Sequence, residues 1–183
     1  MEIINIILLI FIGFLLIILS WVWPPDSPWS PWWRTNGKKA MAAATLANIT
    51  ENDLVYELGS GDATFLVVAS KKFGAQSVGI EIDPTRHIIA MINVKKNKLG
   101  KKVKLKKANF FEEDLSSATV VFVYLVPRVL EKLKPKLLKE LKKGTRVVSF
   151  NYEFPSASKD SSGPELTFVQ TDKENKMHLY KVS

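Results

Sequence analysis

Apolar runs of strand length alternate with amphipathic stretches of helix length over most of the chain. Short continuous apolar runs are typical of buried strands, whereas apolar residues that repeat every three or four positions are typical of helices. The predicted strands cover residues 54–58, 77–82, 103–108, 119–126 and 145–150. The predicted helices cover residues 38–49, 63–73, 84–99 and 128–143. Because strands and helices alternate, the pattern predicts a doubly wound parallel sheet that binds its ligand at the carboxyl ends of the strands.

The distribution of lysine and proline distinguishes the predicted elements from one another. The strand at 103–108 alternates apolar residues with lysines, which is typical of an edge strand that must not pair further. The run at 119–126 is continuously apolar and is predicted to be central. Helix 128–143 has leucines along one face and lysines on the other, and Pro135 is expected to kink or divide it.

The C-terminal part of the chain departs from the alternation of strand and helix. A polar stretch at 156–163 is predicted to be a loop, and the runs at 166–171 and 177–182 are predicted to pair as a hairpin. The expected fold class is therefore α/β, with a Rossmann-like, doubly wound, mostly parallel sheet and a C-terminal antiparallel hairpin.

The N-terminal segment is continuously apolar over the length of a membrane span. Residues 3–23 carry no charged side chain, and 21 residues at about 1.5 Å each match a hydrocarbon core of about 30 Å. A cleaved signal peptide is the alternative, but no Lys or Arg precedes the run and a Trp-Pro sequence follows it. We therefore expect one transmembrane helix in front of the α/β domain.

Tryptophan and proline are concentrated at the end of this segment. All five tryptophans lie between Trp21 and Trp33, and indole rings favour the headgroup layer of a bilayer. Four prolines in the same region prevent a helix from continuing: Pro24, Pro25, Pro28 and Pro31. The sequence thus predicts three parts, a transmembrane helix at 1–23, an interfacial connector at 24–34 and a globular domain at 35–183.

The charge of the chain alone does not distinguish among several classes of partner. The net charge of +8 suits an anionic bilayer, nucleic acid or an acidic protein. Arg34, Lys38 and Lys39 follow the apolar segment, so the positive-inside rule places the domain of a single-pass membrane protein in the cytoplasm. The chain has no cysteine and two histidines, which excludes disulfides and thiolate metal sites, and we expect no metal.

Two lysine-rich stretches raise the question of nucleic acid. Eight lysines lie between Lys95 and Lys107, and eight basic residues lie between Arg128 and Arg146. No aromatic residues that could stack on bases interleave with them, so nucleic acid is a disfavoured partner. These charges are predicted to lie on outward faces, where they would hold the domain on an anionic leaflet.

The turn after the first predicted strand carries the main chemical signal. Residues 57–62 read Glu-Leu-Gly-Ser-Gly-Asp, and the two glycines let the backbone turn sharply and approach a ligand. A dinucleotide-binding turn has a third glycine where Thr64 stands, and Glu57 is an unfavourable neighbour for a pyrophosphate. A cationic amino-acid ligand fits this turn better, and a nicotinamide-dependent oxidoreductase is a more distant alternative.

The end of the second predicted strand adds a nucleoside signal. Glu81 closes that strand, where its carboxylate can accept hydrogen bonds from both hydroxyls of a ribose. This residue therefore predicts a nucleoside ligand, whichever cofactor binds.

Four ordered motifs in residues 35–183 resemble those of the class I S-adenosylmethionine-dependent methyltransferases. They are Val-Tyr-Glu-Leu-Gly-Ser-Gly-Asp (55–62), Val-Gly-Ile-Glu-Ile-Asp-Pro (78–84), Ala-Asn-Phe-Phe (108–111) and Val-Phe-Val-Tyr-Leu-Val-Pro (121–127). The resemblance implies S-adenosyl-L-methionine as the cofactor and methyl transfer as the reaction.

The resemblance also implies a set of cofactor-binding residues. They are Glu57, Gly59, Ser60, Gly61, Glu81, Ile82, Asn109 and Phe110. By this resemblance Glu57 lies near the methionine ammonium and Glu81 holds the ribose. Ile82 packs on the adenine, and Asn109 meets its amino edge. The chain departs from the family at Ala63, where glycine is frequent, and at Asn109, where aspartate is frequent.

Several shorter features are similar to a narrower group, the membrane-anchored protein-lysine methyltransferases. This group includes the mitochondrial enzymes that act on ATP synthase and on the adenine nucleotide translocase. The shared features are the apolar segment, the Trp-Pro connector, and the motifs Leu-Gly-Ser-Gly-Asp, Tyr-Leu-Val-Pro and Arg-Val-Val-Ser-Phe with Phe-Pro downstream. The similarity implies a lysine of a membrane-associated protein as the methyl acceptor.

Residues that follow the fourth and fifth strands are candidates for the acceptor pocket. The catalytic candidates are Tyr124, Pro127 and Tyr152, with Phe150, Glu153 and Phe154 beside them. A buried pocket lowers the pKa of a lysine amine toward neutrality. The alternatives are that the aromatic residues are core and that Glu153 is a solvated loop charge. At the level of function, a lipid or quinone methyltransferase and a non-catalytic S-adenosylmethionine-binding domain stay open.

Overall fold

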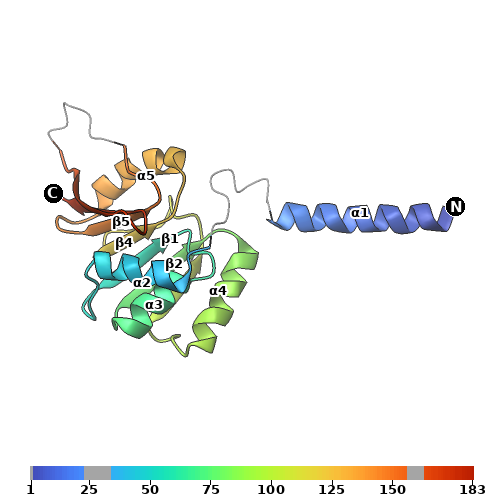
Figure 1. The fold of residues 1–183 in the computed structure, drawn as a ribbon, viewed down its shortest axis with the longest axis horizontal. Helices are drawn as coiled ribbons and strands as arrows, with labels where there is room; N and C mark the ends of the chain where they lie inside the picture. The colour runs from blue at the N-terminus through green and yellow to red at the C-terminus, as the bar shows by residue number, and fades with distance from the viewer. Residues whose placement is uncertain (1, 23–33, 156–162) are drawn as a thin grey trace. The chain divides into compact units, whose positions relative to one another are not determined.

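The computed structural model of the protein describes residues 2–22, 34–155 and 163–183 (Figure 1). The chain divides into two compact units, Met1–Pro31 and Trp32–Ser183. Unit 1 contains helix α1, and unit 2 contains a sheet with helices on both of its faces.

Helix α1, Glu2–Val22, occupies the apolar N-terminal segment as the sequence predicts (Figure 1). Its aliphatic and phenylalanine side chains from Ile3 to Ile18 are exposed. None of the helices in the described part of the chain is identified as long and apolar enough to cross a membrane. The predicted transmembrane assignment of 1–23 is therefore not confirmed. The predicted connector at 24–34 lies outside the described residues, apart from Arg34.

Unit 2 is built on a seven-stranded mixed sheet. The strands are β1 Leu54–Leu58, β2 Gln76–Glu81, β3 Val103–Lys107, β4 Val120–Val123, β5 Arg146–Phe150, β6 Leu166–Asp172 and β7 Met177–Val182. Their spatial order is β3-β2-β1-β4-β5-β7-β6. The first five pair in parallel, whereas β7 pairs antiparallel with both β5 and β6. The mostly parallel sheet and its antiparallel C-terminal hairpin are confirmed.

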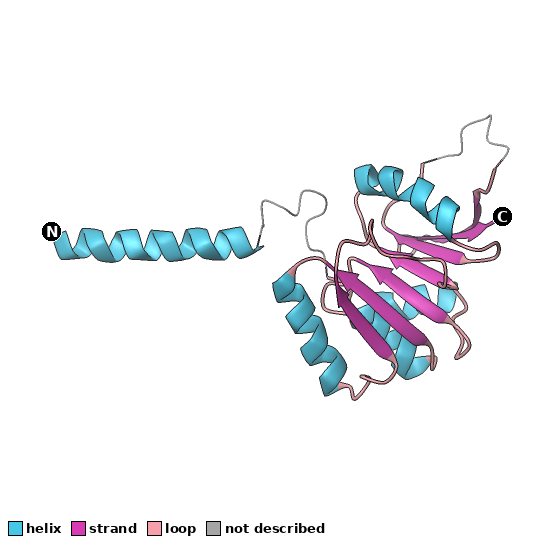
Figure 2. Cartoon of the chain, turned by 180° about the vertical axis from the view of Figure 1, so that it is seen from behind, coloured by secondary structure: helices cyan, strands magenta, loops and turns pink. Residues whose placement is uncertain are grey.

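The helices cover both faces of the sheet (Figure 2). The helices of unit 2 are α2 Gly37–Leu46, α3 Thr64–Lys72, α4 Pro84–Lys96 and α5 Pro127–Glu140. Buried residues of α2, α3 and α4 form one core cluster with one set of strand side chains, and those of α5 form a second cluster with the other set. Alternate strand residues point to opposite faces, so β1, β4 and β5 each contribute to both cores.

Charge and burial place the individual strands as predicted. β3 is an edge strand with exposed lysines, and all of β4 is buried at the centre of the sheet. Pro135 does not divide its helix, because α5 continues through it. Leu133 and Leu137 are fully buried on either side of Pro135 and hold both halves of α5 against the sheet.

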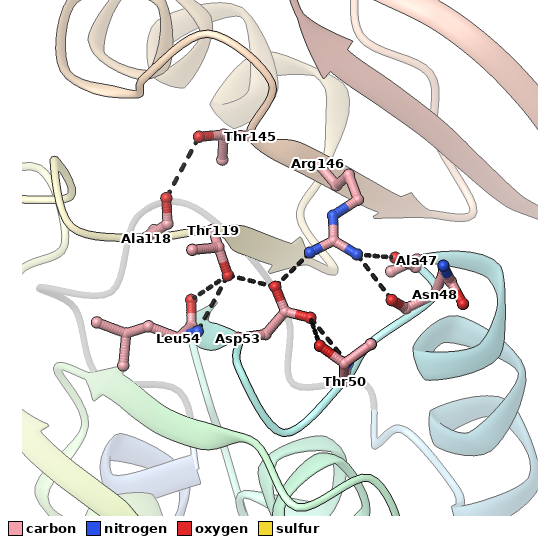
Figure 3. A network of polar contacts seen from close by, with 9 residues as sticks. All are labelled: Ala47, Asn48, Thr50, Asp53, Leu54, Ala118, Thr119, Thr145 and Arg146. Carbon is pink, nitrogen blue, oxygen red and sulfur yellow. Dashed lines mark hydrogen bonds and ion pairs between the residues drawn. The ribbon is translucent and has the colours of Figure 1, made fainter.

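A polar network joins the amino ends of the strands (Figure 3). The Asp53 carboxylate accepts a hydrogen bond from Thr119 Oγ1 at 2.6 Å and pairs with the Arg146 guanidinium. Arg146 also donates to the carbonyl oxygens of Ala47 and Asn48 at 2.7 Å each. Burial raises the pKa of Asp53, but the Thr119 hydrogen bond and the Arg146 charge outweigh it and lower that pKa. The network fixes the end of α2 to the sheet and leaves the carboxyl ends of the strands for function.

Candidate functional site

The glycine turn after β1 is anchored on the neighbouring strand. Gly59 and Gly61 adopt φ angles of 77° and 51°, a region that L side chains rarely occupy. The N–H groups of Gly59 and Ser60 both donate to the Ile80 carbonyl oxygen, at 2.9 and 3.0 Å. The turn therefore has a fixed shape and lies between β1 and β2, at the carboxyl ends of both strands.

Two residues after the glycines complete this turn. Asp62 accepts a hydrogen bond from the Thr64 N–H at 3.1 Å and one from Arg34 Nε at 2.5 Å, so it acts as a turn residue. Ala63 begins α3 with φ 59°, the conformation for which the family frequently uses glycine. A left-handed alanine is strained by about 1–2 kcal/mol. Alanine at this position therefore adds strain to the turn.

Glu81 holds the glycine turn and the start of α4 together. One oxygen of its buried carboxylate accepts from the Gly61 N–H at 2.8 Å, and the other accepts from the Asp83 N–H at 3.0 Å. Asp83 in turn caps α4 by accepting from the Arg86 N–H at 2.8 Å, as expected of a cap residue. Each carboxylate oxygen has a second lone pair, so the predicted bonds to ribose hydroxyls are compatible with this arrangement.

The Glu57 carboxyl is buried beside this turn, and its surroundings do not fully offset the cost of removing it from water. It is 5% exposed, and its Oε2 has no hydrogen-bond partner in the described structure. Burial, and then the negative charges of Asp62 and Glu81, raise the pKa of Glu57 well above its usual value. Ser60 Oγ is a second buried polar atom without a partner among the described residues. A ligand with a cationic group and a hydrogen-bonding group would satisfy both, which fits the amino-acid end of S-adenosylmethionine.

Gly79, in the middle of β2, is a site residue that the sequence analysis missed. A Cβ atom there would lie 2.6 Å from Leu66 Cδ1, 2.8 Å from Ser60 Oγ and 2.9 Å from Leu105 Cδ2. The missing side chain therefore makes room for the glycine turn to lie close to β2. Its signal in the sequence is a glycine inside an otherwise apolar strand, which indicates close backbone approach.

The predicted adenine residues lie at the ends of β2 and β3. Ile82 is 51% exposed directly after Glu81. The Ala108 N–H donates to the Glu81 carbonyl oxygen at 3.1 Å, which brings the segment that contains Asn109 and Phe110 beside Ile82. The exposed apolar side chain of Ile82, with Glu81 and Asn109 nearby, is suited to contact a planar base.

The Asn109 side chain is engaged in its own turn. Its Nδ2 donates to Glu112 Oε1 at 3.0 Å, and its Oδ1 accepts from the Phe111 N–H at 3.1 Å. The rings of Phe110 and Phe111 contact each other with centroids 4.7 Å apart. The predicted contact of Asn109 with the adenine amino group thus requires its amide to exchange one of these partners, and it stays a prediction.

Aromatic side chains gather after β4 and at the end of β5. The rings of Tyr124 and Phe150 contact each other with centroids 4.2 Å apart. Lys39 Nζ lies 4.7 Å from the centroid of the Phe150 ring. Burial, and then the neighbouring Tyr152, raise the pKa of Tyr124. Of the three catalytic candidates, Tyr124 packs against the core cluster that contains Phe150, whereas Tyr152 packs against the core cluster that contains α5.

The other acceptor-pocket candidates have different surroundings. Pro127 is exposed at the first turn of α5. Phe154 is core, because it is buried and its ring packs edge-on against Tyr180. Glu153 is exposed and lies 3.5 Å from His178 Nδ1. For Phe154 and Phe150, which is also buried, the core interpretation is the correct one.

The chain matches a family of known sequences over the region that contains this site. The model of the ANTKMT methyltransferase domain matches residues 57–161, more than half of the chain. The match begins at Glu57 and includes every cofactor candidate and the three catalytic candidates.

Individual proteins agree with this match. A protein-lysine N-methyltransferase of Saccharolobus islandicus is 42% identical over 130 residues, which cover 70% of this chain and 79% of that protein. A lysine N-methyltransferase of ATP synthase from Caenorhabditis elegans is 24% identical over 120 residues, which cover 66% of this chain and 62% of that protein. The crystal structure of an RNA methyltransferase from Salinibacter ruber in complex with S-adenosyl-L-homocysteine has a TM-score of 0.70 and 34% identity. That similarity covers 81% of this chain and 92% of the other.

Proposed function

We propose that this protein, which belongs to the ANTKMT methyltransferase family and is an S-adenosylmethionine-dependent methyltransferase, methylates a lysine of a membrane-associated protein. The observation that carries the lysine acceptor is the similarity, at 42% identity, to a protein-lysine N-methyltransferase. The partly buried Tyr124, which follows β4 at the same edge of the sheet as the glycine turn, supports it.

The carboxyl edge of the sheet supplies the groups that S-adenosylmethionine needs. Glu57 would pair with the methionine ammonium, and Ser60 would hydrogen-bond to the same end of the cofactor. Glu81 would accept from the ribose hydroxyls while it keeps its bonds to the turn. Ile82 would pack on the adenine, and Asn109 and Phe110 would border it. Bound here, the cofactor supplies an electrophilic methyl group on a positively charged sulfur.

The residues around the acceptor have to orient a neutral amine and exclude water. The lysine amine first loses a proton to solvent, which partial burial beside Tyr124 and Phe150 favours because it lowers the amine pKa. The surrounding residues would then hold its lone pair in line with the methyl group that the bound cofactor would supply, so that an N–C bond could replace the C–S bond. Charge on sulfur disappears in this step, so alignment contributes more to the rate than a strong base.

Membrane attachment through α1 is the second part of this proposal. Contiguous exposed apolar side chains along a whole helix are unfavourable in water and favourable in a bilayer. The positive charges at Arg34, Lys38 and Lys39 favour a cytoplasmic location of unit 2. An enzyme held there would meet lysines close to the membrane surface at high local concentration.

A methyl-transfer experiment tests this function. The full chain is incubated with host membranes and S-adenosylmethionine that carries a radioactive methyl group, and the labelled acceptor is identified chemically. We expect the label in methyl-lysine of a membrane fraction protein, and no label with the Glu57→Gln variant.

The other outcomes identify the competing functions. Label that is extracted with lipids would replace the lysine acceptor with a lipid or quinone. Label that is removed by ribonuclease would favour an RNA acceptor, which the Salinibacter ruber structure and the basic surface make the main rival. Stoichiometric cofactor binding without any labelled product would indicate a binding domain.

A further inference from the structure

Helix α4 exposes an apolar surface that no described element of unit 2 covers. Four large apolar side chains of this helix are exposed, and we call them the α4 apolar face: Ile88, Ile89, Met91 and Ile92. On the opposite side of the helix, Ala90 and Val94 are buried in the core of unit 2. The helix is therefore apolar on both sides, although only one side is needed to pack on the sheet.

The spacing of these residues makes the face continuous. Ile88 and Ile92 are four positions apart, and Ile89 and Ile92 are three apart, so their side chains are neighbours on the helix surface. Lys95 and Lys96 follow one turn later and are exposed on the same strip. An apolar strip that ends in cations has the composition of a helix that lies in a membrane interface.

The chain segment that contains this face carries charges of a single sign. Between Pro84 and Phe111 the chain contains nine cationic residues and no Asp or Glu. Six of the lysines are exposed: Lys95, Lys96, Lys98, Lys101, Lys104 and Lys107. They lie at the end of α4, in the loop that follows and on the edge strand β3. This part of unit 2 would therefore attract a surface of negative charge over a wide area.

We propose that the α4 apolar face is a lipid-binding surface, which inserts into the headgroup layer of an anionic bilayer while the lysines around it contact lipid phosphates. Interfacial helices bury their apolar face about 5–10 Å into the boundary between headgroups and acyl chains. Since α4 begins three residues after Glu81, this contact turns the cofactor edge of the sheet toward the membrane surface.

The charges favour a bilayer over a second copy of this chain. Two α4 faces placed together would bring two sets of lysines together with no carboxylates between Pro84 and Phe111 to neutralise them. An anionic leaflet neutralises the same lysines and buries the same isoleucines. The proposal deepens the proposed function and rests on it, because it names the surface by which the catalytic unit itself meets the membrane, separately from α1.

Site-specific fluorescence on the full chain tests this contact. The chain has no cysteine, so Ile92→Cys can be labelled uniquely with an environment-sensitive nitrobenzoxadiazole dye. Val169→Cys is the matched control, since it replaces an exposed aliphatic residue on β6, at the opposite edge of the sheet. Both proteins are reconstituted in phosphatidylcholine–phosphatidylglycerol vesicles with and without doxyl-labelled lipid.

We expect the dye at position 92 to lose most of its emission with doxyl lipid and the dye at position 169 to keep it. Vesicles that float with bound protein but leave the dye at position 92 unquenched would overturn the α4 proposal and leave membrane attachment through α1 intact. Protein that does not float with the vesicles would overturn both. A spectral change of the dye at position 92 that depends on protein concentration without lipid would assign the face to a second copy instead.

Discussion

Replacing Glu57 by glutamine should stabilise the unliganded protein while it weakens cofactor binding. The Glu57 carboxyl is 5% exposed, and its Oε2 has no partner among the described residues. Burial is the largest cause of its raised pKa, and the charges of Asp62 and Glu81 add to it. Glutamine keeps the shape of the side chain and removes the charge that the site has to desolvate.

The magnitude follows from the linkage between proton binding and folding. Because the pKa of Glu57 is raised above 4.5 in the folded protein, the folded state binds more protons than the unfolded state between these two values. The free energy of unfolding therefore falls as pH rises through this window, by about 1.4 kcal/mol per pH unit. The stability that the protonated Glu57 carboxyl contributes is fully present below its unfolded pKa and is lost as pH rises through its folded pKa. The Glu57→Gln variant has no titratable group at this position, so its free energy of unfolding should lack this dependence on pH.

Urea unfolding in detergent, repeated between about pH 5 and pH 8, measures the difference. The variant should gain stability over the unsubstituted protein as pH rises, with the two curves closest at the acidic end. Parallel curves would refute the reasoning. In calorimetry the unsubstituted protein should release a proton when it binds S-adenosylmethionine, because the cofactor ammonium favours the Glu57 carboxylate. This release, seen as a dependence of the binding enthalpy on the buffer, should be absent in Glu57→Gln.

Three further predictions concern other parts of unit 2. Gly79→Ala should lower the free energy of unfolding by about 1–3 kcal/mol through overpacking against Leu66 and Ser60, and unchanged urea curves would show that the turn tolerates a methyl group there. Asp53→Asn should lower the free energy of unfolding by about 1–3 kcal/mol at neutral pH. The stability that the Asp53 carboxylate contributes is present above the unfolded pKa of 3.8 and is lost as pH falls through the lower folded pKa. The cofactor affinity of this variant should stay unchanged, and a loss would contradict the separation of the two sheet edges. Tyr124→Phe should slow methyl transfer by about 2–10-fold with unchanged cofactor affinity, and an equal effect on binding would place Tyr124 in the cofactor site instead.

The local sequence pattern predicted correctly the bounds of some elements whose residues are buried along most of their length. The strand at 54–58 coincides with β1, because a short, mostly apolar run between polar turns has few alternatives. The predicted strand at 119–126 is longer than β4, Val120–Val123. The chain leaves the sheet after Val123, and Tyr124 contacts Phe150 there. An apolar residue in a strand and one beside a strand end look the same in a sequence.

Contacts between distant segments could not be predicted from local patterns. The hairpin of β6 and β7 was predicted, but its insertion with β7 next to β5 depends on pairing between residues about thirty positions apart. The same limit applies to the site. Glu57 and Glu81 were identified, whereas the bond from Gly61 to Glu81 and the packing of Ser60 over Gly79 arise only when β1 and β2 lie side by side.

Calorimetric titration of S-adenosylmethionine into the full chain tests the cofactor site most directly, with Glu81→Gln as the variant and Glu153→Gln as the matched control. Both substitutions remove one carboxylate charge, but Glu81 is buried at the glycine turn and Glu153 is exposed. We predict that Glu81→Gln weakens binding by about 10–100-fold, the loss of about 1.5–3 kcal/mol from hydrogen bonds to a charged group, and that Glu153→Gln binds as the unsubstituted protein does. Equal affinity of all three proteins would contradict a cofactor site built on Glu81.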